Sequence, residues 1–190
     1  MHVRCVKALQ NPEGIGDPEG MAAQDRDEAT GSGPERTADG HHVIIDGRRW
    51  RATDPSIPDG FRQELVDELM AARRAVKASE ADARRRVQDA KTALGERGAP
   101  WWEERSGEAF GERIAAAVRA LTRKRTGSSI CPSDVARTLG GESWRDLMPD
   151  VRRIAAELAD QEEVVVTQKG EAVSIRDARG PVRIVRGPAL

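Results

Sequence analysis

Basic side chains gather in the C-terminal third of the chain, where apolar periodicity predicts a helix over residues 144–158. Arg145, Arg152 and Arg153 lie on or near this helix, and Lys169 follows in a turn. A guanidinium group donates paired hydrogen bonds to phosphate oxygens or to the edge of guanine. We therefore expect Arg145, Arg152, Arg153 and Lys169 to form a nucleic-acid-binding surface.

Acidic residues on the same predicted helix oppose this interpretation. Asp150, Glu157 and Asp160 would repel phosphate, so a plain solvated face is the alternative. A second basic cluster ends the preceding helix, where cations either hold phosphate or offset the negative end of the helix dipole. Its members are Arg119, Arg123, Lys124 and Arg125.

Cys131 is the one candidate nucleophile in the predicted folded part of the chain. It precedes Pro132 at an expected helix N-terminus, where backbone amides lower the pKa of a thiol. No histidine is near it in sequence to act as a base, so a small buried group that caps the helix is the favoured interpretation. We find no catalytic constellation, and we expect a protein that is not an enzyme.

Neither a metal nor a cofactor is expected. His41 and His42 are adjacent on an extended segment, so their side chains point to opposite faces and cannot chelate together. No Cys/His spacing suggests zinc, and no glycine-rich loop of the phosphate-binding kinds is present.

The tryptophans are the largest side chains available for burial. Trp144 is expected to anchor the core of the C-terminal domain. The pair Trp101-Trp102 either stacks bases or packs two helical units together, and packing is favoured. The run Arg84-Arg85-Arg86 is expected to be a solvated helix face.

Composition indicates a soluble protein. The 190 residues are 33% charged with a net charge of -1, and no apolar run is long enough to span a bilayer. The two cysteines, Cys5 and Cys131, lie far apart, so a reducing cytoplasm is the expected location. The pI of about 6.3 lacks the strongly basic signature of many nucleic-acid binders, so any such binding must use a local patch.

The first two-thirds of the chain divide into a tail and a small mixed unit. Residues 1–40 have few large apolar groups and are expected to be disordered, and Met21 is an alternative start to Met1. Residues 41–105 begin with a β-hairpin around Asp46-Gly47. A helical pattern follows over residues 59–97, either as two helices turning near residues 78–82 or as one continuous helix.

Residues 106–190 alternate helices with short strands. Helical faces are predicted over residues 109–126, 132–139 and 144–158, with Pro149 either kinking the third helix or marking its start. Strands are predicted at residues 128–130, 164–167, 172–175 and 181–185. Ser79 with Asp82, and Ser143 with Asp146, have capping-box spacing.

Several motifs in this region resemble, in order, a bacterial winged-helix-like family, domain of unknown function 3253. The resemblance implies a winged-helix fold over roughly residues 108–185 and no established activity, and some relatives carry the name "biopolymer transporter Tol". Segments upstream resemble an N-terminal extension of some actinobacterial members. The motifs are residues 130–137, 144–149, 166–170 and 179–181, and upstream 47–58, 95–98 and 101–102.

The sequence thus predicts a mainly helical α+β protein. A disordered tail (1–40) precedes a β-hairpin with a helical hairpin (41–105) and a C-terminal winged helix-turn-helix (106–190). We expect a non-enzymatic module that binds DNA or RNA or acts in regulation, with no membrane and no small-molecule cofactor. The alternative is an adaptor whose winged helix and Trp-bearing surfaces bind a protein partner.

Overall fold

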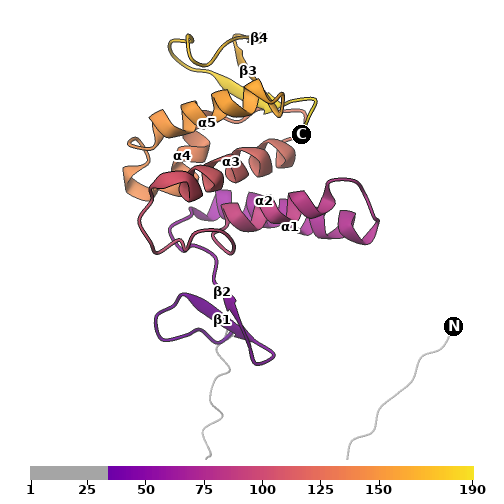
Figure 1. Ribbon diagram of the computed structural model, residues 1–190, viewed down its shortest axis with the longest axis vertical. Coiled ribbons are helices and arrows are strands. Elements are labelled where there is room, and N and C mark those ends of the chain that lie inside the picture. The colour runs from indigo at the N-terminus through magenta and orange to yellow at the C-terminus, as the bar shows by residue number, and fades with distance from the viewer. Residues whose placement is uncertain (1–33) are drawn as a thin grey trace, which may run out of the picture. The chain divides into compact units, whose positions relative to one another are not determined.

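A β-hairpin opens the part of the chain that the computed structural model describes, residues 34–190 (Figure 1). Strand β1 (His42–Ile45) pairs with β2 (Arg48–Arg51) in antiparallel register. The turn residues Asp46 and Gly47 have φ angles of 51° and 70°. This is the left-handed backbone of the tight turn that Asp-Gly favours, so the predicted hairpin is confirmed.

The predicted disordered tail lies largely outside the described residues. Its last part, residues 34–40, runs along β1, where Arg36 bridges Val43 and the amide of Ile44 donates to the carbonyl of Glu35 at 2.7 Å. The outer edge of β1 is therefore covered by the chain itself.

Two helices follow the hairpin, α1 (Asp59–Lys77) and α2 (Ala83–Ala93). They form a helical hairpin, which settles the choice between a hairpin and one continuous helix. The predicted capping box is wrong, because Asp82 precedes α2 in a left-handed conformation and its side chain caps nothing. Ser79 is also left-handed, so the chain reverses through backbone conformation without glycine or proline.

The C-terminal part contains α3 (Gly107–Lys124), α4 (Pro132–Gly140), a short 3-10 helix η1 (Gly141–Ser143) and α5 (Met148–Asp160). Pro149 lies in the first turn of α5 and marks its start, so Trp144 and Leu147 precede the helix. The predicted capping box at Ser143 and Asp146 is wrong, because these residues form a turn before the helix begins.

A three-stranded antiparallel sheet closes the chain, with β3 (Val164–Gln168) between β4 (Glu171–Ala172) and β5 (Arg183–Arg186). The strand predicted at residues 128–130 is reduced to one bridge, between Ile130 and Ile184. The strand predicted at 172–175 is shorter and starts one residue earlier. The mixed α and β fold with small antiparallel sheets is as predicted, and its helices predominate.

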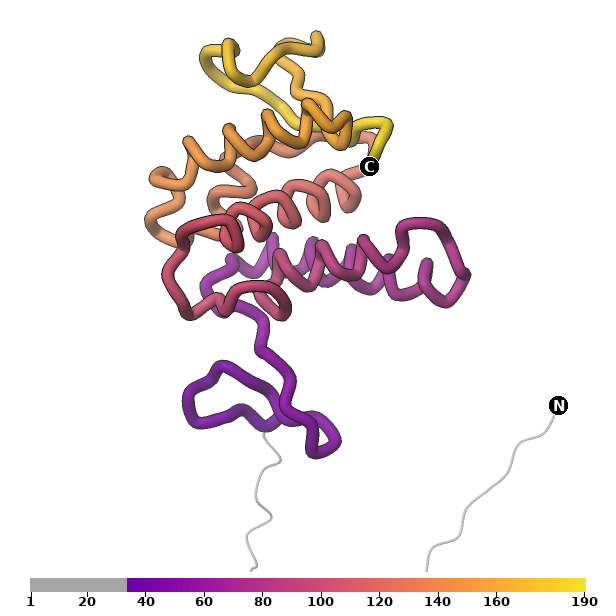
Figure 2. Tube along the Cα trace, in the orientation of Figure 1, coloured from indigo at the N-terminus to yellow at the C-terminus, as the bar shows by residue number. Residues whose placement is uncertain are grey.

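Helix α3 is the centre of the core. It lies between the α1–α2 hairpin on one side and α5 with the sheet on the other (Figures 1 and 2). Ile114, Val118 and Leu121 are fully buried on it. The described residues form one compact unit, and the predicted domain boundary at residue 105 falls between α2 and α3. Within residues 34–190, no helix is both long and apolar enough to cross a membrane.

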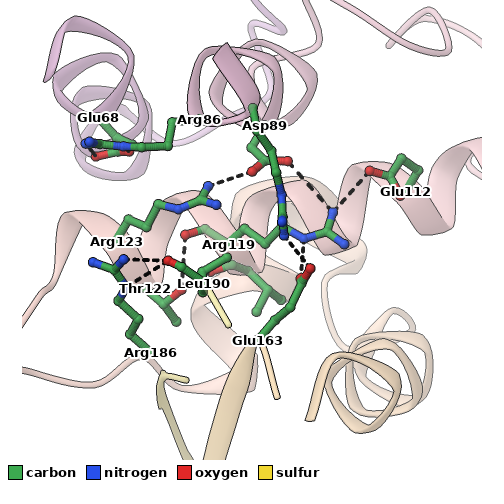
Figure 3. A network of polar contacts seen from close by, with 12 residues as sticks. Glu68, Arg86, Asp89, Glu112, Arg119, Thr122, Arg123, Glu163, Arg186 and Leu190 are labelled. Carbon is green, nitrogen blue, oxygen red and sulfur yellow. Dashed lines mark hydrogen bonds and ion pairs between the residues drawn. The ribbon is translucent and has the colours of Figure 1, made fainter. Parts of the chain in front are cut away.

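A layer of charged side chains joins α3 to both neighbours (Figure 3). Arg123 and Asp89 are almost fully buried and pair at 2.6 Å between Nη1 and Oδ2. Arg119 pairs with Glu163 at 2.6 Å between Nε and Oε2. The second basic cluster is therefore neutralised within the fold, since Lys124 and Arg125 also pair with acids on α1.

The expectation of a solvated face for residues 84–86 is wrong for Arg86 alone, since Arg84 and Arg85 are exposed. Arg86 forms two hydrogen bonds to the buried carboxylate of Glu68, at 2.9 and 3.2 Å, and joins α2 to α1. Arg85 pairs with Glu163. Arg84 is exposed, as predicted.

Replacing Asp89 by Asn should destabilise the fold strongly. The substitution keeps the size of the side chain but leaves the buried charge of Arg123 without its closest carboxylate, which costs about 3 kcal/mol or more of unfolding free energy. Asp67→Asn is the matched control, because Asp67 pairs with Lys124 at 2.7 Å but both side chains are exposed. Urea unfolding should show a far smaller loss for Asp67→Asn, and equal losses would contradict this account.

Candidate nucleic-acid interface

The turn before α5 holds two arginines against one indole. The guanidinium carbon of Arg137, from α4, lies 4.7 Å from the centre of the Trp144 ring, and that of Arg145 lies 4.5 Å away. Both arginines are exposed. No carboxylate among residues 34–190 lies within ion-pair distance of either.

Close backbone packing builds this turn. A side chain at Gly140 would meet Trp144 Cβ and Leu147 Cδ1, both at 3.1 Å, so glycine lets the turn fold back on α4 without displacing these neighbours. Trp144 is half-buried and packs its inner edge on the core. The expectation that Trp144 anchors the core is therefore met only in part: the indole packs on the core, but it stays partly exposed beside the two surface arginines.

Arg152 supports the loop that leads to β5. Its Nη2 donates to the carbonyl oxygens of Ile175 and Ala178 at 2.9 and 2.8 Å. The side chain is half-buried in this position. Its hydrogen-bonding capacity is directed at protein carbonyls, so the predicted contact residue lies under the loop and not on an open surface.

Arg153 is exposed on α5 but paired within its own helix. It bonds to Glu157 at 2.7 Å and approaches Asp150 at 3.4 Å. The hydrogen bond to Glu157 raises the pKa of Arg153. The acidic neighbours identified from the sequence thus neutralise this arginine.

Lys169 is exposed at the β3–β4 turn, with a φ angle of 53°. The loop beyond it is held by Gln168, whose side chain donates to the carbonyls of Arg179 and Pro181 at 2.8 and 3.1 Å. Asp160, at the end of α5, binds Arg176 of the same loop, and this hydrogen bond lowers the pKa of Asp160. Lys169 has no such ionic partner among residues 34–190.

The other candidate groups have structural roles. Cys131 lies at the N-cap of α4, and its amide donates to Asp134 at 3.0 Å, so the capping role is confirmed, but the side chain is half-buried and not buried as expected. Trp101 donates to the carbonyl of Ala52 at 2.9 Å, and His41 stacks on Trp102 with ring centres 4.0 Å apart. The tryptophan pair therefore packs the hairpin onto the helical unit. Residues 34–190 contain no cluster of His, Cys, Asp or Glu able to hold a metal ion.

The part of the chain that carries these groups, residues 111–187, matches the model of a family described as "Protein of unknown function (DUF3253)". This part of the chain belongs to the DUF3253 family. None of the curated proteins matches the chain. The DUF3253 segment starts within α3 and extends past β5, so it includes every residue predicted to contact nucleic acid.

Sequence reasoning missed Arg137 as a surface group of the DUF3253 segment. Its position on the exposed side of α4 follows from Val135, Ala136 and Leu139 being buried. Its contact with Trp144 across the turn had no signal in the sequence, because it depends on how closely Gly140 lets the two segments approach.

Replacing Arg152 by Ala should release the loop over residues 173–178. Hydrogen bonds from a charged donor contribute about 1.5–3 kcal/mol each, so we expect a loss of about 2–3 kcal/mol of unfolding free energy. The amide of Ala178 should also exchange faster with solvent. Arg153→Ala, the neighbouring control, should leave that amide and the stability nearly unchanged. Faster exchange in Arg153→Ala alone would refute the supporting role of Arg152.

Proposed function

We propose that residues 111–187 form a winged helix-turn-helix module that binds the phosphate backbone of nucleic acid. The order of elements supports the fold: α3, a bridge residue, α4, α5 and then the β3–β5 sheet, with Ile130 adding to β5. In this arrangement α5 takes the place of the recognition helix, and the loop between β3 and β5 takes that of the wing.

The pair of arginines on Trp144 carries this proposal. Contact with the indole orients both guanidinium groups, and such cation–π contacts contribute about 0.5–1 kcal/mol at exposed sites. Both side chains are exposed and have no carboxylate partner among residues 34–190, so their N–H groups stay available to phosphate oxygens. Two oriented cations beside the start of α5, where the helix dipole is positive, suit an anionic backbone.

Backbone binding fits the structure better than base reading. Arg152 is directed at loop carbonyls and Arg153 at carboxylates of α5, so neither is positioned to read guanine. The exposed Asp150 and Glu157 would also face phosphates if the middle of α5 entered a groove. We therefore propose that Arg137, Arg145 and Lys169 supply the contacts, with little sequence preference.

Three phosphate contacts give a weak, strongly salt-dependent complex. The log of the association constant with a mixed-sequence 20-base-pair DNA duplex should fall with log salt at a slope of about 2.7, since each contact contributes about 0.9. Arg145→Gln or Arg137→Gln should each flatten that slope by about 0.9. Fluorescence anisotropy of a labelled duplex measures both quantities, and a duplex RNA tests the alternative nucleic acid.

Arg153→Gln is the control for this titration. It removes the same charge from an exposed position on α5, but its slope should match that of the unchanged protein. The absence of salt-dependent association at low ionic strength with DNA and RNA would disprove the proposed function. A larger loss for Arg153→Gln than for Arg145→Gln would instead favour insertion of α5 into the groove.

A further inference from the structure

The outer face of the β-hairpin exposes apolar side chains. Val43 and Trp50 are directly opposed in the register, and Ile45 lies on the same face two residues along β1. Ile45 is 47% exposed and Trp50 is 48% exposed, which makes them the two most exposed large apolar residues among those described. Trp50, and not Trp101, Trp102 or Trp144, is therefore the tryptophan that the fold leaves open to a partner.

A groove with a basic rim runs along this face. Its lining includes Val43, Ile45 and Trp50, and the charged groups at its border are Arg36, Asp46, Arg48, Arg51, Arg73, Lys91 and Glu96. Lys91 pairs with Glu96 at 3.2 Å and also lies 5.9 Å from the centre of the Trp50 ring. Arg36 and Arg48 have no carboxylate partner among residues 34–190, so the rim carries an excess of positive charge.

We propose that this groove, the hairpin groove, binds a short protein segment that alternates acidic with large apolar side chains. Aliphatic and aromatic groups of the partner would cover Val43, Ile45 and Trp50, and its carboxylates would meet Arg36 and Arg48. Apolar contact supplies most of the affinity of such a complex, and the charges select the partner and its orientation.

Other occupants fit the hairpin groove less well. Single-stranded nucleic acid is held by several aromatic platforms, but Trp50 is the one aromatic residue here, and Lys91 lies against its ring. A second copy of the chain, docked face to face, would bring the two basic rims together. An acidic, apolar segment is the occupant that satisfies both the charge and the exposed side chains.

Neighbouring arginines on β2 give the test a matched pair. Arg48 and Arg49 are both exposed, but successive residues of a strand point to opposite faces, so only Arg48 borders the hairpin groove. The probe is a fluorescein-labelled 12-residue peptide that alternates Asp or Glu with Leu or Phe. Fluorescence anisotropy with the full chain measures its binding.

We expect Arg48→Glu to weaken binding of the peptide by about tenfold and Arg49→Glu by less than about twofold, since the charge reversal acts mainly at contact distance. Ile45→Ser should weaken binding without altering charge. Circular dichroism confirms that each variant keeps its fold. A peptide with Ser in place of Leu and Phe, and one with Lys in place of the acids, should both fail to bind.

Three results would overturn this proposal. The first is an equal response of Arg48→Glu and Arg49→Glu, and the second is tighter, Trp50-dependent binding of a 12-nucleotide oligothymidine. The third is a dimer in sedimentation that Arg48→Glu dissociates. The proposal is independent of the function proposed for the DUF3253 segment, since Arg145 does not line the hairpin groove. Arg145→Gln should therefore leave binding of the peptide unchanged.

Discussion

The fold depends on keeping the buried charges of α3 neutralised. Arg123 and Arg119 lie in the layer between the helical hairpin and the C-terminal sheet, and a buried charge without a partner is strongly destabilising. Asp89 reaches them from α2, and Glu163 reaches Arg119 from the start of β3. Burial raises the pKa of Asp89, although Arg123 opposes that rise. The desolvation of these charges offsets much of their attraction, so the ion pairs add little net stability. Their main effect is to fix the position of α3 relative to α2 and to the start of β3.

This constraint also determines which cations remain for binding. Five of the six arginines on α2 and α3 pair with acids from other segments of the fold, and Arg152 supports a loop. The DUF3253 segment keeps several exposed cations without a carboxylate partner among residues 34–190: the pair on Trp144, the lysine at the β3–β4 turn, and Arg179 and Arg183. The proposed interface therefore lies at the start of α5 and not along its middle. An abundance of arginine in the sequence is poor evidence for binding, because the partner of each guanidinium group decides its role.

Local signals predicted most of the elements but not the contacts between them. Asp46-Gly47 specified the hairpin turn, and apolar spacing located the helical regions, because these patterns depend on neighbouring residues. Apolar spacing left open whether residues 59–97 form one helix or two, and the structure shows two. Capping-box spacing failed twice, because it does not report the left-handed backbone of Asp82 and because Ser143 and Asp146 form a turn before α5 begins. The buried pair of Arg113 with Asp54, 2.7 Å apart and 59 positions apart in sequence, had no local signal at all. Arg145 and Lys169 were named from the sequence as candidate contact residues, and both are exposed in the structure. The partners of Arg152 and Arg153, and the contact of Arg137 with Trp144, could be found only from the tertiary structure.

The most direct test of this account observes the arginine side chains themselves. In a nitrogen-15-labelled full-length chain, the Nε–Hε signal of each assigned arginine can be followed by NMR while a short DNA duplex is added at low salt. We predict that the signals of Arg137 and Arg145 shift, while those of Arg123 and Arg152 stay in place. Shifts at Arg152 and Arg153 with none at Arg137 and Arg145 would contradict the account, because α5 would then bind through the side chains that the fold holds in internal contacts.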